Sequence, residues 1–206
     1  MSNENRAKLS DIAFSDTVKA IQERKGSRQI YAQSEENGDW SSVLDDNLKA
    51  FIARQRSVFF GSANGDGQPY IQHRGGPPGF LQVLGDTTIA FADYRGNKQY
   101  ITQANLQDNP KAFLFLIDYE MRRRLKIWGN ARVVEDDPGL SGKLMPEGYR
   151  ALPEQVILFD VTLWNLNCPQ HIPQRFEAAD VQRALQARDA RIAELEATVA
   201  ALRAGN

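Results

Sequence analysis

The organisation of the chain is decided around residues 91–100, which read FADYRGNKQY. Residues 87–92 are β-branched or apolar, so they predict a strand that leads into this stretch. Gly96 interrupts the apolar pattern, and a helix is expected to begin close behind it, near Asn97 or Lys98. The order strand, glycine-containing basic loop and helix is therefore expected here.

The expected helix ends before Asn109 and Pro110, because a proline disfavours a helical residue ahead of it. The start of a helix offers free backbone N–H groups and a partial positive charge. Arg95 and Lys98 add full positive charges beside it. This combination suits a phosphate group, and the alternative is a solvated connection with ordinary surface cations.

Composition indicates a globular chain of one main domain with appendages. It has 206 residues, of which 42% are hydrophobic, enough for a sizeable core. The net charge of −1 gives no sign of a nucleic-acid partner. No apolar run is long enough for a membrane span, and the polar start shows no signal peptide. With one cysteine, Cys168, and two histidines, no internal disulfide or zinc site is expected, and we expect a cytoplasmic protein.

Short runs of apolar and β-branched residues, separated by tight turns, dominate the middle of the chain. They predict an antiparallel barrel in a mainly β (α+β) fold. Helices are expected at 15–26 and 45–55 as covers for the sheet, with a polar loop at 34–41 between them, and a short helix is expected at 138–144. Strands are expected at 58–63, 68–74, 80–84, 88–92, 111–117, 124–134 and 156–164.

The last thirty residues follow a different pattern. Residues at spacings of three and four form a heptad repeat with one charged interruption, and they are Ala178, Val181, Leu185, Arg188, Ile192, Leu195, Val199 and Leu202. β-Branched residues at position a and leucine at position d favour a parallel two-stranded coiled coil. A single amphipathic helix folded back on the barrel is the alternative.

Four longer motifs resemble those of a known family. They are residues 69–80 (PYIQHRGGPPGF), residues 91–100, residues 122–126 (RRRLK) with Gly129, and residues 167–173 (NCPQHIP). Together they resemble the pyridoxamine 5′-phosphate oxidase-like FMN-binding split barrels, in the branch of flavin-nucleotide-binding proteins related to that oxidase.

The resemblance spans about residues 45–175 and implies a six-stranded antiparallel split β-barrel. It also implies a homodimer with FMN at the subunit interface, each site being built from both subunits. The expected organisation is a helical segment at 1–44, the FMN-binding barrel at 45–175, and a C-terminal helix at 176–206.

The resemblance implies which residues bind FMN. Arg74 stands where the oxidase has a phosphate-binding arginine, and Asn97, Lys98 and Gln99 stand at its Gly-Ser-Arg-Lys turn. Arg124 stands at a glutamine that reaches the flavin of the partner subunit, where a positive charge would favour reduced flavin. The full set of expected cofactor-binding residues is Gln72, His73, Arg74, Ala92, Arg95, Asn97, Lys98, Gln99, Arg123, Arg124, Gln170 and His171.

Several of these residues also have a structural interpretation. The arginines at 122–124 could form an exposed turn that balances Asp118 and Glu120. The glycines and prolines at 75–79 could lie against the flavin ring or form a rigid corner. His73 could line the core or the interface, and Cys168 is expected to be a packed thiol.

The oxidase has a lysine after the arginine that corresponds to Arg74, and it has a closing Arg-Leu-His pattern. This chain lacks both features. Oxidation of pyridoxamine phosphate is therefore not expected, whereas flavin binding is. The leading hypothesis is an FMN-dependent oxidoreductase acting on a nicotinamide or small organic substrate. The alternatives are a non-catalytic flavin module, such as a carrier or redox sensor, and a haem-binding split barrel with His73 or His171 as ligand.

Overall fold

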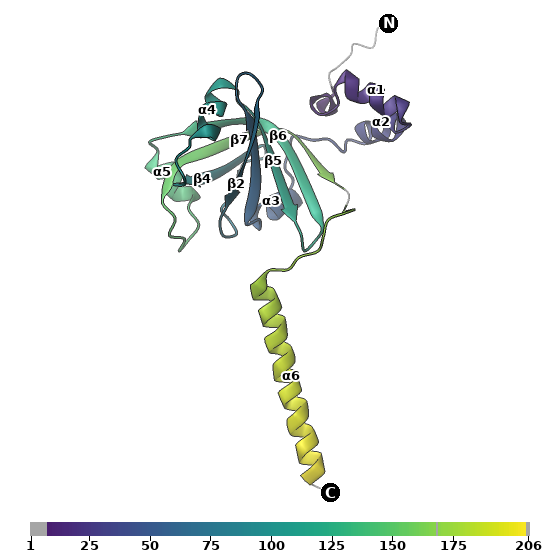
Figure 1. Ribbon diagram of the computed structural model, residues 1–206, viewed down its shortest axis with the longest axis vertical. Helices are drawn as coiled ribbons and strands as arrows, with labels where there is room; N and C mark the ends of the chain where they lie inside the picture. The colour runs from purple at the N-terminus through teal and green to yellow at the C-terminus, as the bar shows by residue number, and fades with distance from the viewer. Residues whose placement is uncertain (1–7, 168, 205–206) are drawn as a thin grey trace. The chain divides into compact units, whose positions relative to one another are not determined.

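The computed structural model describes residues 8–167 and 169–204, in two compact units (Figure 1). One unit comprises Met1–Asp118 and Arg123–Pro169, and the other comprises Tyr119–Arg122 and Gln170–Asn206. The first unit contains the sheet, and the second contains the long C-terminal helix. Cys168 lies outside the described residues, so its expected role as a packed thiol stays a prediction.

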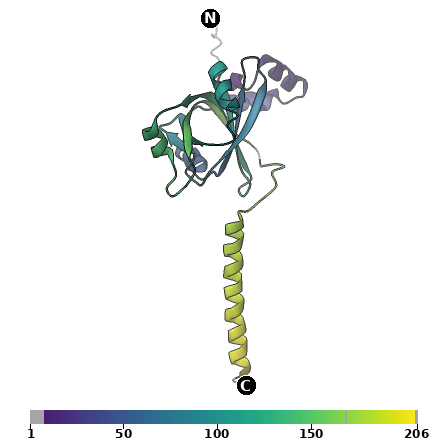
Figure 2. The ribbon, with the colours of Figure 1, turned by 60° about the vertical axis from the view of Figure 1, so that its left-hand side comes forward.

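The first unit is built on one antiparallel sheet of seven strands in the order β2-β1-β5-β6-β7-β4-β3. The sheet curves strongly around its core (Figure 2). Among the described residues, no ladder joins β2 to β3, so the sheet stays open, and its seven strands exceed the six that the resemblance implied. The strands are β1 (Ser57–Ala63), β2 (Pro69–Gly75), β3 (Gln82–Leu84), β4 (Thr88–Tyr94), β5 (Lys111–Asp118), β6 (Arg123–Val134) and β7 (Pro153–Asn167).

The strands form where the sequence alternates apolar and polar residues. Along β1, alternate residues are fully buried, including Val58 and Phe60, since one face of the strand covers the core. The β6–β7 pairing shifts register at Gly129. A Cβ atom on Gly129 would lie 2.3 Å from the carbonyl oxygen of Asp160, so only glycine allows this close approach of the two strands.

Three helices pack on the sheet or connect its strands: α3 (Asp46–Ala53), α4 (Ile101–Asp108) and α5 (Pro138–Leu144). The Asp45 carboxylate caps α3 by accepting from the backbone N–H of Leu48 at 2.8 Å. Helix α3 buries Phe51 and Ile52 in the main core, as expected of a cover for the sheet.

The N-terminal segment consists of η1 (Leu9–Ile12), α1 (Asp16–Arg24) and α2 (Arg28–Glu36). The loop predicted at 34–41 is wrong in its first part, because α2 continues to Glu36. Ion pairs stabilise the helix despite its polar sequence, because the buried Glu35 carboxylate pairs with Arg28 at 2.5 Å and with Lys8 at 3.1 Å.

The interpretation of the first helix as a cover for the sheet is also wrong, because α1 contributes no residue to the main core. Aromatic contacts instead stabilise this segment. The ring centroid of Phe14 lies 5.2 Å from that of Tyr31 and 4.9 Å from that of Trp40. Trp40 in turn lies 6.5 Å from Trp128 of β6.

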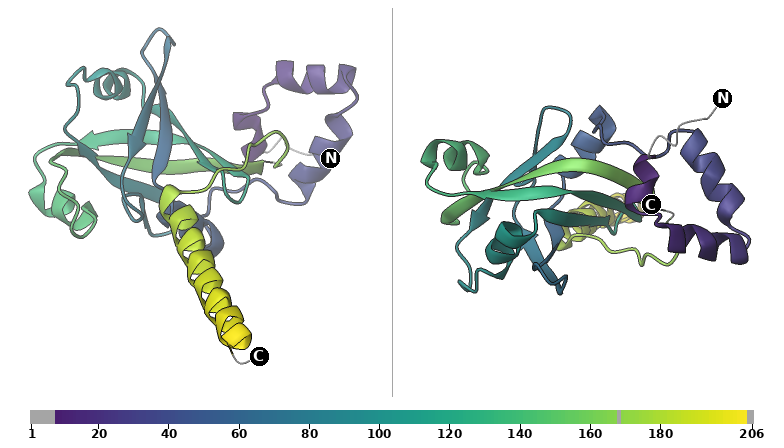
Figure 3. Two further views of the ribbon diagram at one scale, coloured as in Figure 1. Left: turned by 60° about the horizontal axis from the view of Figure 1, so that its bottom comes forward. Right: turned by 90° about the horizontal axis from the view of Figure 1, so that it is seen from above.

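The second unit contains α6 (Ala178–Ala204), an unbroken helix of 27 residues (Figure 3). This confirms the helix expected at the C-terminus, and none of its side chains is buried. No helix in the described part of the chain is long and apolar enough to cross a bilayer.

Candidate functional site

The loop after β4 is longer than the sequence suggested. Strand β4 extends to Tyr94 and α4 begins at Ile101, so the expected helix start near Asn97 or Lys98 is wrong by three to four residues. Lys98 and Tyr100 both have positive φ, 57° and 54°, which interrupts a right-handed helix. The Asn97 side chain stabilises this turn, since its Oδ1 accepts from the backbone N–H of Gln99 at 3.3 Å.

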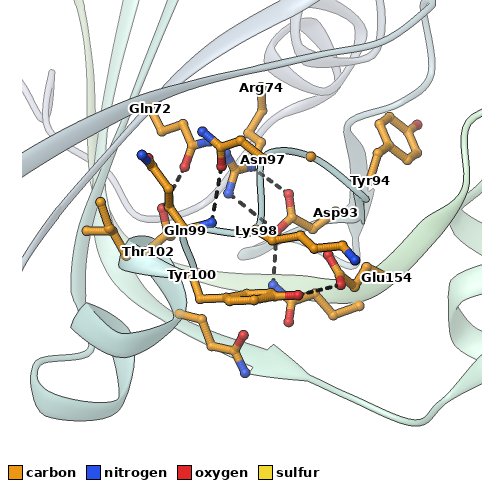
Figure 4. Close-up of a pocket in the computed structure, with 14 residues that line it drawn as sticks. Gln72, Arg74, Asp93, Tyr94, Asn97, Lys98, Gln99, Tyr100, Thr102 and Glu154 are labelled. Atoms are coloured by element: carbon orange, nitrogen blue, oxygen red, sulfur yellow. Dashed lines mark hydrogen bonds and ion pairs between the residues drawn. The ribbon is translucent and has the colours of Figure 1, made fainter.

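This loop forms one wall of a surface pocket, called here the loop pocket (Figure 4). The other walls come from β2, the end of β4, the start of α4 and the start of β7. The pocket is lined by Gln72, Arg74, Asp93, Tyr94, Gly96, Asn97, Lys98, Gln99, Tyr100, Ile101, Thr102, Gln103, Glu154 and Gln155.

An ion pair between Arg74 and Asp93 lies in the loop pocket. The Arg74 Nε atom is 2.6 Å from Asp93 Oδ1, and Nη2 donates to Oδ2 at 3.3 Å. The two side chains are only 15% and 10% exposed. Asp93 Oδ2 also accepts from the side chain of Gln155, its neighbour across the β4–β7 ladder, at 3.0 Å. Asp93 and Gln155 therefore hold the guanidinium in place.

A second set of contacts fixes α4 against the sheet. The Thr102 hydroxyl donates to Gln72 Oε1 at 3.2 Å, and the Tyr70 hydroxyl donates to the same oxygen at 3.3 Å. One turn later, the buried Asn105 amide donates to the Ser62 hydroxyl at 3.0 Å. These bonds set the position of the first turn of α4 relative to β2.

Tyr100 bridges the loop and β7. Its hydroxyl donates to the Glu154 carboxylate at 2.9 Å. This hydrogen bond, with the nearby negative charge, raises the pKa of Tyr100, while Arg95 weakly opposes the shift. Tyr100 is exposed, so its hydrogen bond lies at the pocket mouth, within reach of solvent.

The pocket offers donors for an anion as well as charge. Tyr100 precedes α4 without capping it, and the first three helical residues, Ile101 to Gln103, line the pocket. The Lys98 ammonium forms no ion pair with any residue the structure describes. Two cations, Arg74 and Lys98, stand against two carboxylates, Asp93 and Glu154, so charge is formally balanced.

Five of the twelve expected cofactor residues meet in the loop pocket: Gln72, Arg74, Asn97, Lys98 and Gln99. The pocket thus brings together residues from two of the motifs, and the phosphate site at these residues stays a prediction.

Three further expected residues of the same unit lie elsewhere. His73 points to the face of β2 opposite Arg74, where its Nε2 is 2.7 Å from the Ser57 hydroxyl and its ring packs on Phe59. Ala92 is buried against Leu144 and Val156 rather than facing the pocket. Arg95 is exposed, and its backbone N–H donates to the Leu152 carbonyl at 2.9 Å.

Of the remaining four expected residues, two belong to the same unit and do not line the loop pocket. Arg123 and Arg124 begin β6, where Arg123 is exposed and Arg124 is half-buried. Asp118 pairs with Arg54 at 3.2 Å and lies opposite Arg123 in the β5–β6 ladder, and its expected balance with the arginines at 122–124 stays a prediction. Gln170 and His171 belong to the second unit, where both are exposed.

Residues 75–79 form a tight corner. A Cβ on Gly76 would lie 2.7 Å from the Cβ of Phe80, and Gly79 adopts a φ of 88°. The backbone N–H of Gly79 donates to the Ala53 carbonyl at 2.7 Å, which ties the corner to α3. Close packing therefore accounts for Gly76 and the positive φ for Gly79, which agrees with the structural interpretation of a rigid corner.

Nine residues that line the pocket were not among the expected ones, and they include Asp93, Thr102, Glu154 and Gln155. Asp93 stands inside the opening stretch, and its position directly after the apolar run at 87–92 was a signal that could have identified it. Glu154 and Gln155 come from β7, sixty residues away in sequence, and only the β4–β7 pairing places them here.

Comparison with protein families gives one match. Residues 44–168 match the family model described as "Pyridoxamine 5′-phosphate oxidase". Comparison with curated proteins gives no match.

Solved structures with a similar chain path have low sequence identity. A HupZ variant from Group A Streptococcus is 17% identical, with a TM-score of 0.49 over 60% of this chain and 99% of its own. HutZ, a heme storage protein of Vibrio cholerae, is 14% identical, with a TM-score of 0.39 over 57% and 89%. A pyridoxamine 5′-phosphate oxidase-related, FMN binding protein from Nostoc punctiforme is 12% identical, with a TM-score of 0.40 over 57% and 77%. At these values, none of the three decides the cofactor.

Proposed function

Because the chain belongs to the pyridoxamine 5′-phosphate oxidase family, we propose that it is an FMN-binding protein whose loop pocket holds the flavin phosphate. The seven-stranded sheet is then the family's split barrel with one additional short strand. The observation that carries the proposal is the convergence of Arg74, Lys98 and the first turn of α4 on one pocket.

The donors of the pocket suit a phosphate dianion. Such a group requires two or more charge-assisted donors. Lys98 supplies an ammonium without an ion-pair partner among the described residues. The side-chain amides of Asn97 and Gln99 and the N-terminal backbone N–H groups of α4 add uncharged donors.

Arg74 can serve the phosphate while it remains bound to Asp93. Its Nε and Nη2 atoms face Asp93, and Nη1 has no partner in the described part of the chain. A guanidinium carries five N–H donors, so one edge can be held by a carboxylate while the other meets a ligand. Asp93 thereby fixes the direction in which Arg74 presents its remaining donors.

The proposed activity is that of an FMN-dependent oxidoreductase acting on a nicotinamide or small organic substrate. The flavin supplies hydride and electron transfer when bound, while the chain supplies binding, orientation and charge. Arg123 and Arg124 would approach the flavin of a second subunit, as part of a cytoplasmic homodimer with FMN at the interface. A cation at the ring would favour the reduced, anionic flavin.

Two other functions are alternatives that the experiment below would distinguish from this proposal. A non-catalytic flavin carrier or sensor would bind FMN without turnover. A haem protein would need an axial ligand, and His73 Nε2 is already 2.7 Å from the Ser57 hydroxyl. That contact concerns His73 alone, so His171 stays the other candidate ligand for haem.

The absorption spectrum of the purified full chain tests the cofactor, and mass spectrometry of the released ligand identifies it. We expect flavin bands and the mass of FMN, whereas a Soret band would overturn the proposal. Anaerobic mixing with NADH or NADPH then tests turnover. Bleaching of the flavin bands supports the oxidoreductase, and unchanged bands with both donors favour the non-catalytic module.

A further inference from the structure

Helix α6 carries an exposed apolar line that the proposed flavin site does not use. Its six large apolar side chains are 44–68% exposed, and they are Val181, Leu185, Ile192, Leu195, Val199 and Leu202. They recur at intervals of three, four and seven residues, which places them along one side of the helix. This line is called the α6 seam below.

The repeat of the seam is that of a coiled coil. An average spacing of 3.5 residues gives a narrow line rather than the wide apolar face of a helix packed on a globular core. Helix α6 continues for 27 residues without interruption, so the seam lies on one rigid element. An exposed apolar line of this length favours burial against a partner.

We propose that the partner is a second copy of the chain, and that two α6 helices form a parallel, in-register coiled coil. Ile192 and Val199 occupy position a, while Leu195 and Leu202 occupy position d. β-Branched residues at a with leucine at d favour two parallel strands. This pairing does not depend on flavin binding.

The charges beside the seam fit the same arrangement. Arg191 lies at position g and Glu196 at the next position e. In a parallel pair these positions face each other across the interface, which forms two attractive contacts by symmetry. In the single chain Arg191 donates to Glu194 at 2.6 Å. Both side chains are more than 60% exposed, so the loss of this ion pair costs little free energy when Arg191 turns to Glu196 of the second copy.

Arg188 is the one charged residue within the seam, at position d. In a parallel coil, a side chain at d packs beside position e of the other helix, which here is Asp189. Each Arg188 therefore meets an acidic side chain of the second copy. A polar layer of this kind fixes the register of a coil at some cost in stability.

Antiparallel pairing fits the charges less well. It brings position e against e and position g against g. In the two registers that align most of the seam, either Asp189 faces Glu196, or Arg191 and Asp189 each face their own copies. Both registers place like charges side by side, so the second copy is expected to run in the same direction.

Cysteine cross-linking of the full chain tests this inference, in a background where Cys168 is replaced by serine. Leu202→Cys places a thiol at position d near the helix end, where two copies meet only in a parallel, in-register pair. The matched control is Ala201→Cys, one residue earlier and on the outer face. With oxidised glutathione, we expect Leu202→Cys to cross-link at least tenfold faster than the control, and equal rates would overturn the inference.

A third variant separates pairing of the helices from proximity caused by other parts of the chain. Adding Ile192→Asp to Leu202→Cys places two carboxylates within the seam. If the coiled coil brings the thiols together, the cross-linking rate falls at least tenfold. An unchanged rate would show that another contact holds the tails, and would overturn the coil.

Discussion

Two regions were expected to bind the flavin, and they differ in how far one chain assembles them. In the loop pocket, side chains from β2, β4, α4 and β7 meet around Arg74. At the start of β6, Arg123 and Arg124 were expected to act on the flavin of another subunit. The pocket is formed by a single chain, whereas the arginine pair at β6 is proposed to complete a flavin site on a second chain.

The two regions also differ in electrostatics. In the loop pocket Asp93 holds Arg74 almost out of solvent, while Lys98 has no ion pair among the described residues. At the start of β6, cations follow one another along the strand. Burial, and after it the charge of Arg124, lowers the pKa of Lys126. The first region thus holds one arginine still, whereas the second places Arg123, Arg124 and Lys126 along one strand, with Asp118 opposite Arg123.

The largest expected effect comes from breaking the Arg74–Asp93 pair. Arg74→Ala leaves a nearly buried carboxylate without its cation, which costs about 3–5 kcal/mol of unfolding free energy. Chemical denaturation measures this loss. The matched control is Arg132→Ala, because Arg132 pairs with Asp160 at the same 2.6 Å but the two side chains are 58% and 47% exposed.

The control variant should lose no more than about 1 kcal/mol, as is usual for a surface ion pair. Similar losses in the two variants would mean that Asp93 does not depend on Arg74. FMN affinity should also fall in Arg74→Ala, but the folding defect makes it an unclear test of the ligand site.

Lys98→Ala separates ligand binding from folding. Lys98 has no ion pair among the described residues, so its removal should change unfolding free energy by less than about 0.5 kcal/mol. FMN affinity should fall by about 1.5–3 kcal/mol, the range for a hydrogen bond to a charged group. Fluorescence titration measures the affinity, with Lys111→Ala, an exposed lysine on β5, as control. Equal affinity in the two variants would remove Lys98 from the site.

Arg124→Gln tests the second region. If Arg124 lies at the flavin ring, removing its charge should lower the two-electron reduction potential by about 20–30 mV, equivalent to roughly 1–1.4 kcal/mol. Affinity for the phosphate should stay unchanged, since the loop pocket is intact. A potentiometric titration measures the shift, and a value equal to that of the unaltered protein would mean that Arg124 acts elsewhere.

The smallest effect concerns Lys126. Its ammonium lies 5.5 Å from the Trp128 ring centroid, which partly offsets the cost of burial. Because its folded pKa is below the ordinary value of 10.5, the charged form destabilises the fold at neutral pH. Lys126→Met should therefore raise unfolding free energy by less than about 1 kcal/mol, since the site is partly solvated.

The sign of the pH dependence follows from the same shift. The advantage of Lys126→Met should be largest at neutral pH and shrink as pH rises through the folded pKa and past 10.5, above which lysine is neutral in both the folded and the unfolded state. Denaturation curves at several pH values measure this difference. An advantage that grows with pH would contradict a burial penalty at Lys126.

Much of the sheet could be predicted because its strands are coded locally. Alternation along β1 and the turn before β2 set that hairpin, and Pro110 sets the end of α4. The extent of β7 and the continuation of α2 could not be predicted in this way. They depend on cross-strand pairing with β6 and on the burial of Glu35, neither of which leaves a local pattern.

The candidate site likewise contains residues that local motifs predicted and features that depend on tertiary contacts. Arg74, Asn97, Lys98 and Gln99 were expected from motifs, and they share one pocket. The helix start was predicted too early, because the left-handed conformations of Lys98 and Tyr100 come from tertiary context and not from glycine. Their roles in binding FMN, like those of Arg123, Arg124, Gln170 and His171, remain predictions.

Comparing FMN with riboflavin tests the central claim most directly, because the two differ only in the phosphate. If the loop pocket grips that phosphate with two or more charged donors, FMN should bind about 3 kcal/mol, or roughly 100-fold, more tightly than riboflavin. Lys98→Ala should remove a large part of that difference while leaving riboflavin affinity unchanged. Equal affinities of the unaltered protein for FMN and riboflavin would contradict a phosphate site in this pocket.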